Sequence, residues 1–185
     1  LPIYGGFNAT AWDSRSGNAK ATQLEAGEST EAMHCYGNVS CRLDGLSLIG
    51  LSGGTNSTGL RWNSNGNLII HNCIVSAGSL NTSSETNIQA ILIEQASGSP
   101  EISSSSLYGG LLSTTATGRT RGLYITGNGN GNSYIHDCTI DGGTVTSTGT
   151  TPLAQTFGLD CANAYGPVIA NCLIWGGVAS ADNLN

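Results

Sequence analysis

The sequence is poor in charged residues. Asp, Glu, Lys and Arg make up only 10% of its 185 residues, whereas an ordinary soluble domain contains about 25%. Six residues are Lys or Arg and twelve are Asp or Glu, so the net charge is -6. This balance argues against a nucleic-acid partner, because phosphate binding needs a basic stripe. It also argues against adsorption to anionic lipid.

Long apolar runs are missing as well. No stretch approaches the roughly 20 residues that a membrane span requires. The chain starts at Leu1, without an initiating Met or a signal peptide, so we interpret it as a mature or excised piece of a protein. Leu, Ile and Val recur at regular intervals among many Ser, Thr, Asn and Gly residues. A disordered chain would be short of such apolar residues, so the composition favours a folded domain.

Two series of short segments repeat along the chain. In the first series, two apolar positions are separated by one residue of any kind and are followed by Gly-Gly or a near equivalent. Its segments are 46–50, 73–78, 105–110, 138–143 and 172–177. These segments start 27, 32, 33 and 34 residues apart. The second series lies at 32–36, 59–63, 90–94, 122–126 and 158–162, with spacings of 27, 31, 32 and 36. Each unit therefore holds two short strands, a polar turn and a variable loop.

The apolar residues alternate with a period of two, which predicts strands. Residues one unit apart should lie above one another at the spacing of hydrogen-bonded strands, about 4.8 Å. Like side chains then form apolar columns such as Leu43, Ile70, Ile102, Ile135 and Ile169. The sequence therefore predicts an all-β, right-handed parallel β-helix of about five coils of roughly 32 residues. A sandwich or barrel of hairpins is the competing architecture, but the long loops after each Gly-Gly favour the coil.

A tight bend is expected just before the column that contains Cys138. The residues at this bend are Gly45, Asn72, Ser104, Asp137 and Asn171. Asn and Asp tolerate left-handed backbone, and their side chains either form a ladder or are separate surface turn residues. Cys138 and Cys172 should lie on neighbouring coils. They could be bonded or could pack as small apolar thiols, and the pattern leaves both open.

We expect one continuous domain, with a lead-in coil at residues 1–31 and regular β-helix coils at residues 32–185. The opening LPIYGG resembles the segments of the first series, and the chain stops in a loop after the last of them. Neither end has a recognisable cap, and uncapped strand edges pair with other chains. We therefore expect either a fragment of a longer protein or an uncapped subunit that contacts other copies of itself end to end, which would give a filament.

The units GLRWNSNGNLIIHNCIVSAG, GLYITGNGNGNSYIHDCTIDGG and GLDCANAYGPVIANCLIWGG resemble the repeats of bacterial right-handed parallel β-helix surface and secreted proteins. Those proteins belong to the pectate-lyase-like superfold. The segments IYGGFNATAWDSR and CRLDGLSLIG are similar to the lead-in of such proteins. The resemblance implies a secreted or surface-anchored chain. It is weak for function, because this architecture carries lyases, hydrolases, adhesins and passive stalks alike.

No catalytic residue is assigned. A polysaccharide lyase needs a base beside calcium-binding carboxylates, and a hydrolase needs carboxylates a few ångströms apart. The expected outward columns do not combine several carboxylates with a basic residue in one coil, although Asp137 and Asp141 flank one strand. His71 and His136 share a column but lie two coils apart, about 9–10 Å, which is too far for one metal ion. We expect no metal and no cofactor.

Other residues are candidates for binding or modification. Tyr108 and Trp175 occupy the same outward position in two units, with Tyr4 matching them in the opening segment, and could bind carbohydrate. Cys35 and Cys41 bracket a short turn and are candidates for a disulfide. Glycosylation sequons occur at Asn8, Asn38, Asn56 and Asn81.

The sequence thus favours a non-enzymatic structural module of an extracellular or cell-surface protein, such as a head-to-tail stacking filament subunit. The alternatives are a glycan- or cell-binding adhesin module and a polysaccharide lyase or hydrolase. These classes differ in what they need from the surface: edges that pair, a platform of exposed aromatic rings, or a cluster of ionisable groups.

Overall fold

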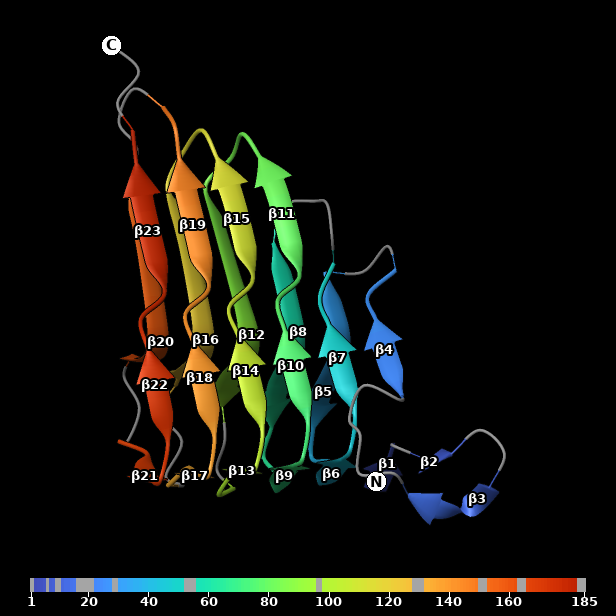
Figure 1. Cartoon of the computed structure of the whole chain (residues 1–185). Helices are drawn as coiled ribbons and strands as arrows, with labels where there is room; N and C mark the ends of the chain where they lie inside the picture. The colour runs from blue at the N-terminus through green and yellow to red at the C-terminus, as the bar shows by residue number, and fades with distance from the viewer. Residues whose placement is uncertain are drawn as a thin grey trace.

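The computed structural model describes residues 2–5, 7–8, 11–15, 22–27, 30–51, 56–95, 98–127, 132–149, 153–162 and 166–182. These residues form strands and turns, and no helix occurs among them, so none of them belongs to a helix that could cross a membrane. Parallel sheets stack as a β-solenoid of about 4 turns with coils about 32 residues apart. The predicted parallel β-helix is confirmed, with about four turns in place of the expected five (Figure 1).

Four parallel sheets form the stack (Figure 1). The first sheet contains β1 (Pro2–Tyr4), β6 (Cys41–Asp44), β9 (Leu68–His71), β13 (Glu101–Ser103), β17 (Tyr134–His136) and β21 (Val168–Ala170). The second sheet contains β4 (Gln23–Glu25), β7 (Ser47–Ile49), β10 (Ile74–Ser76), β14 (Ser106–Tyr108), β18 (Thr139–Asp141) and β22 (Leu173–Trp175). The third sheet contains β11 (Ser79–Thr82), β15 (Leu111–Thr114), β19 (Thr144–Ser147) and β23 (Val178–Ala181).

The fourth sheet has the longest strands, and we call it the long sheet. It contains β5 (Glu31–Gly37), β8 (Ser57–Ser64), β12 (Thr86–Gln95), β16 (Gly118–Thr126) and β20 (Ala154–Ala162). A full coil runs through the first, second, third and long sheets in that order. Outside the stack, β2 (Phe7–Asn8) and β3 (Ala11–Arg15) pair as a small antiparallel hairpin beside the N-terminal end (Figure 1).

The register of the strands matches the repeat in the sequence. Ile135 pairs with Ile169 in the first sheet, and Thr139 pairs with Leu173 in the second. Cys138 and Cys172, which immediately precede the latter pair, therefore lie on neighbouring coils as predicted. In the long sheet, Leu123 pairs with Leu159. Residues one repeat apart are thus stacked, which is the geometric condition for the apolar columns.

The apolar columns form one main core inside the coils. Its fully buried members include Trp62, Leu43, Ile70, Leu107 and Ile140. Leu43 and Ile70 were expected to point inward from the period-two pattern, and the structure confirms this. A second, smaller core lies between the third sheet and the long sheet, and its members are Ala77, Leu80, Ile88, Leu112 and Val145, with Ala154 packed against them.

The bend between the first and second sheets has the predicted backbone. The non-glycine residues with φ between 49° and 56° are Asn72, Ser104, Asp137 and Asn171, and Gly45 at the same position has φ 71°. A side-chain contact joins two of these positions, because the amide of Asn171 donates a hydrogen bond to Asp137. Asn and Asp support this left-handed conformation through local hydrogen bonds, which is why they recur at a corner that every coil must turn.

A second corner leads from the second sheet into the third. It contains a glycine at φ 82° to 87° in four coils, namely Gly78, which follows Ala77, and the second glycine of the Gly-Gly pairs, Gly110, Gly143 and Gly177. A Cβ atom on Gly143 would lie 2.3 Å from the carbonyl oxygen of Gly110. This position therefore needs glycine both for its left-handed backbone and for the close approach of the neighbouring coil.

The opening segment joins the stack at a different place from the one expected. LPIYGG was predicted to match the segments of the first series, which form the second sheet. However, Tyr4 pairs with Asp44, so β1 belongs to the first sheet. The second-sheet position in that coil is taken by β4, in which Leu24 pairs with Leu48. The alternating apolar pattern of a three-residue strand fits either sheet, so the pattern alone could not distinguish them.

Candidate functional site

The outward face of the long sheet carries an arginine that binds across three coils. Arg61 on β8 contacts Glu94 through Nε at 2.8 Å and Nη2 at 2.9 Å, and it contacts Glu31 through Nη1 at 3.3 Å. Glu31 lies on the preceding strand of the sheet and Glu94 on the following one. The bidentate bond to Glu94, followed by the contact with Glu31, raises the pKa of the Arg61 guanidinium.

A second, more buried arginine further along the sheet also contacts residues of the preceding and the following coil. Arg121 on β16 donates through Nε to Asp160 at 2.7 Å and through Nη1 to Asn87 at 3.3 Å. Its guanidinium lies 4.3 Å from the ring centroid of Tyr124 and 5.8 Å from that of Phe157. The Arg121 side chain is only 10% exposed, so these contacts hold a nearly buried cation among two aromatic rings and a carboxylate.

A third arginine completes the set. Arg119 donates through Nε to Gln155 at 2.7 Å and through Nη1 to Glu85 at 3.2 Å. Gln155 belongs to the following coil, and Glu85 precedes β12 in the coil before. We call Arg61, Arg119 and Arg121 the arginine clamps, because each binds an acceptor in the coil before and another in the coil after. All three guanidiniums are therefore engaged in cross-coil contacts.

The arginine clamps were missed from the sequence. The expected outward columns do not combine several carboxylates with a basic residue within one coil, so no arginine stood out as a candidate. Glu31, Arg61 and Glu94 are instead separated by 30 and 33 residues, which is one coil in each direction. Comparing opposite charges at the repeat spacing would have found this set, because stacked coils turn the repeat length into spatial proximity.

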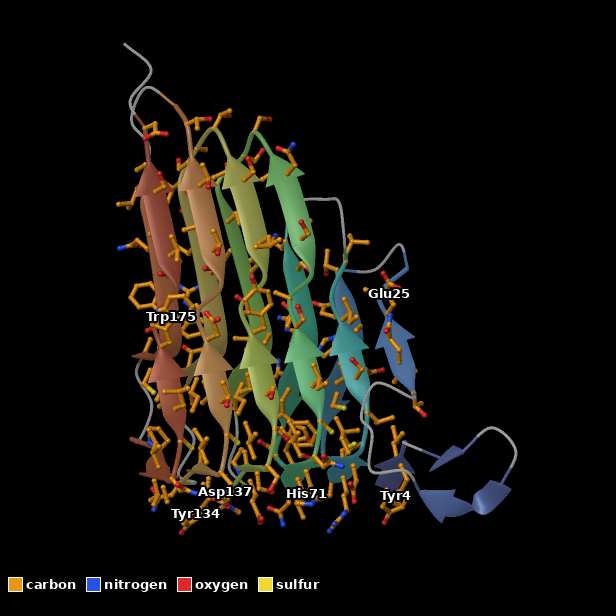
Figure 2. All side chains as sticks on the ribbon, viewed as in Figure 1. Tyr4, Glu25, His71, Tyr134, Asp137 and Trp175 are labelled. Atoms are coloured by element: carbon orange, nitrogen blue, oxygen red, sulfur yellow. The ribbon has the colours of Figure 1, made fainter. Side chains whose placement is uncertain are left out.

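The candidate carbohydrate-binding residues share one row of the second sheet. Tyr108 pairs with Asp141, and Asp141 pairs with Trp175, so Asp141 separates the two rings along the row. Trp175 is 54% exposed, and partial burial raises the pKa of the half-buried Tyr108. Tyr4 does not extend this row, because it pairs with Asp44 in the first sheet; Figure 2 shows Tyr4 and Trp175 on different sheets. Binding of carbohydrate at Tyr108 and Trp175 stays a prediction.

The two carboxylates considered for catalysis are held in turns. Asp137 lies 2.9 Å from Nδ1 of His136 and accepts a hydrogen bond from Asn171. The hydrogen bond with His136, followed by that with Asn171, lowers the pKa of Asp137. Asp141 accepts a hydrogen bond from the backbone N–H of Gly143 at 2.8 Å. A carboxylate with a lowered pKa is a poor general acid at neutral pH, and both side chains have a local structural role at a corner.

The corner around Asp137 also borders a polar hollow of about 490 Å³, which is lined by Asp137, Cys138, Thr139, Asn171, Cys172 and Leu173. Nε2 of His136 lies 3.6 Å from Glu101 on the neighbouring strand, and both side chains are well exposed. Across the described part of the chain, no group of three His, Cys, Asp or Glu residues is arranged to hold a metal ion.

The cysteine and sequon candidates fall in different environments. Cys35 and Cys41 are thiols whose side chains hydrogen-bond to each other, so the turn between them brings them together; the disulfide itself stays a prediction. Burial, more than the neighbouring Cys172, raises the pKa of Cys138 to about 11. Asn38, Asn56 and Asn81 are exposed, and Asn8 lies on β2. Exposure is necessary for glycosylation, which stays a prediction for all four residues.

Comparison with known proteins found no match to any protein-family model, any curated protein or any solved structure. The strand register and the sequence repeat together support the parallel β-solenoid.

Proposed function

We propose that this chain is a non-enzymatic structural module of an extracellular or cell-surface protein. The observation that carries the proposal is the set of arginine clamps, in which every guanidinium of the long sheet joins three consecutive coils. Charged groups that act in catalysis need freedom to exchange protons or bind substrate. Here they connect coil to coil, and partly buried charge networks of this kind favour one fixed register.

The proposal includes lengthening by a second copy at the end of the stack that β21 and β22 form. Ile169 and Ile174 on the last coil are 41% and 39% exposed, whereas their column neighbours Ile135 and Ile140 are 1% and 0% exposed. The edge strands β21 and β22 continue the same sheets in which β1 and β4 are the edge strands at the other end. Ile3 and Leu24 of a second copy would then extend the columns of Ile169 and Ile174, and unpaired strand edges favour such addition.

The third sheet makes the proposed contact specific. Among the described residues it begins at β11, and those of the first coil offer no strand that could continue β23. A stacked copy would protect the edges of β21 and β22 from hydrogen exchange and would leave the edge of β23 open. Uniform protection of all three edges would point to a partner other than a second copy in this register.

The experiment is light scattering and electron microscopy of the purified chain over a range of concentrations. We expect rods that lengthen with concentration, and we expect Ile174→Lys to prevent their growth because it places a charge on the apolar column. Leu111→Lys is the matched control, since Leu111 is also an exposed apolar residue, at 47%, but lies on β15 inside the array. A monodisperse monomer at high concentration would contradict the proposal.

A glycan- or cell-binding adhesin is the second candidate, and the exposed Trp175 in the same row as Tyr108 favours it. Aromatic faces exposed on a sheet can stack on sugar rings. Binding to a glycan array that is lost in both Tyr108→Ala and Trp175→Ala would support this candidate, whereas equal binding by the variants would exclude these residues. A polysaccharide lyase or hydrolase would instead lose activity on substitution of Asp137 or Asp141.

A further inference from the structure

Two cysteines meet at the N-terminal end of the solenoid, within one coil. Cys35 lies on β5, the edge strand of the long sheet, and Cys41 is the first residue of β6. The chain between them is held by the next coil. Ser64 Oγ donates to the carbonyl of Val39 at 2.7 Å, and the N–H of Cys41 donates to the carbonyl of Asn67 at 2.9 Å. The approach of the two thiols is therefore fixed by the fold.

The two thiols face a hollow of about 430 Å³, which is lined by Met33, His34, Cys35, Tyr36, Val39, Ser40 and Cys41. Cys35 and Cys41 are 8% and 5% exposed, so little of each side chain is at the surface, but a small molecule in the hollow would reach them. Cys73 is a useful contrast, because it is 1% exposed in the middle of the main core.

The contact between the two thiols shifts their pKa values in opposite directions. Cys35 donates a hydrogen bond to the sulfur of Cys41, which lowers the pKa of Cys41 to about 7 against the opposing effect of its burial. The same bond, together with burial, raises the pKa of Cys35. Burial raises the pKa of Cys73. A thiolate stabilised at neutral pH beside a second thiol is the arrangement of an attacking and a resolving cysteine.

We propose that Cys35 and Cys41 form a redox-active dithiol that low-molecular-weight disulfides of the glutathione class oxidise to an intramolecular disulfide. The Cys41 thiolate attacks one sulfur of the small disulfide, whose S–S bond breaks and releases one small thiolate. Cys35 then loses its proton and attacks the Cys41 sulfur, which releases the second small thiol. One protein dithiol and one disulfide thus give one protein disulfide and two small thiols.

Oxidation would fix the end of the edge strand β5 to the start of β6. The bond would close the short loop between residues 35 and 41, and it would restrict the turn that the hydrogen bonds of Ser64 and Asn67 already hold. This site does not depend on the proposed stacking of copies. Because a stacked copy would lie against the same end, the reaction should be followed at low protein concentration.

Peptide mapping tests the proposal directly. Trypsin cleaves after Lys20 and Arg42, so peptide 21–42 contains Cys35 and Cys41 and no other cysteine. After treatment of the folded chain with glutathione disulfide and quenching by alkylation, we expect this peptide to lose two hydrogen atoms and take no alkyl label. Peptide 62–119 contains Cys73 alone and should remain a free thiol. Failure of peptide 21–42 to oxidise, or accumulation of a stable mixed disulfide in it, would overturn the proposal.

Single variants assign the two roles. In Cys35→Ser, Cys41 should stop at a mixed disulfide, whereas Cys41→Ser should leave Cys35 unreacted. In the unaltered chain at pH 7, Cys41 should alkylate at least about tenfold faster than Cys73, and Cys35→Ala, which removes the hydrogen-bond donor, should move the pH profile of Cys41 upward. Cys73→Ser is the folding control, because Ser105 naturally occupies the next position of that column. Equal alkylation rates for Cys41 and Cys73 would show two inert packed thiols.

Discussion

The coils before β11 and the coils after it differ by one strand. Between β7 and β8, the described residues 50–51 and 56 form no strand of the third sheet, whereas the later coils have a strand of the third sheet directly after the second sheet. The repeat spacing rises from 27 to 32 residues at the same point. The main core is present in both kinds of coil, but the described members of the second core lie among coils that contain the third sheet.

The difference originates at the corner after the second sheet. In the short coil, Gly50 is followed by Leu51, whereas the later coils have a left-handed glycine at the equivalent corner, as at Gly78. That glycine redirects the chain into an additional strand, whose inward residues then need partners. The comparison indicates that the main core defines the solenoid, and that the third sheet is an addition that depends on its corner glycines.

Gly143→Ala tests that dependence and should have the largest effect. It combines the left-handed penalty of about 1–2 kcal/mol with overpacking of about 1–3 kcal/mol, so we expect a loss of about 2–5 kcal/mol in unfolding free energy. Gly37→Ala is the matched control, since Gly37 has φ 83° but nothing lies within 4 Å of its would-be Cβ. It should cost only the left-handed penalty. Chemical denaturation measures both, and equal losses would mean that contact with the neighbouring coil is unimportant.

Truncation in the two cores would sharpen the comparison. Ile140→Ala removes a fully buried side chain from the main core, and Leu112→Ala removes one from the second core. Both belong to the class that costs about 2–5 kcal/mol, and we expect Leu112→Ala near the lower end because its small cluster can relax. Hydrogen exchange should show local opening of β15 and β19 in Leu112→Ala and global loss of protection in Ile140→Ala. Global opening in both would show that the second core does not unfold separately.

The arginine clamps allow the same comparison on the outer surface. Arg121→Ala should lower the free energy of unfolding by about 1–3 kcal/mol, because it removes the hydrogen-bond partner of the partly buried Asp160 carboxylate. Arg61→Ala should cost no more than about 1 kcal/mol, because the Arg61 side chain is 34% exposed and solvent screens its ion pairs. Thermal unfolding at low and high salt measures the difference. A larger loss of stability in Arg61→Ala than in Arg121→Ala would contradict the expectation that the more buried arginine contributes more to stability.

Much of the fold could be predicted because each coil repeats the same pattern of inward apolar residues and bend residues. The columns of Leu43 and Leu48 follow from period-two alternation at a fixed spacing, and the left-handed bend at Asn72 follows from the small polar residues that recur there. The third sheet was not predicted, since its short strands lie in segments that vary between units. Tyr4 was assigned to the wrong row because the irregular lead-in does not keep the repeat length.

The candidate sites were harder to predict because they depend on side-chain contacts between coils. Tyr108 and Trp175 could be placed in one row by counting, yet whether that row binds a ligand depends on exposure and on Asp141 between them. The approach of Cys35 and Cys41 was expected from their short separation. The acid–base difference between the two thiols required the geometry of the hollow, which no spacing in the sequence encodes.

The histidines at the outer bend should show the smallest effect. His71 in an early coil faces the Ser103 hydroxyl at 3.1 Å, whereas His136 in the same column of a later coil faces Asp137 and Glu101. The hydrogen bond with Asp137, then that with Glu101, raises the pKa of His136 above its ordinary 6.5. Titration followed by NMR should show this rise, and Asp137→Asn should reduce it.

The pH dependence of this pair has a defined window. The His136 contribution to stability is fully present below pH 6.5 and is lost as the pH rises through the raised pKa of the folded state. The Asp137 contribution is fully present above pH 3.8 and is lost as the pH falls through its lowered pKa. The ion pair therefore contributes most between pH 3.8 and pH 6.5. Because both side chains are solvent-exposed, salt should weaken the pair. An unchanged pKa of His136 in Asp137→Asn would show that Asp137 does not raise this pKa.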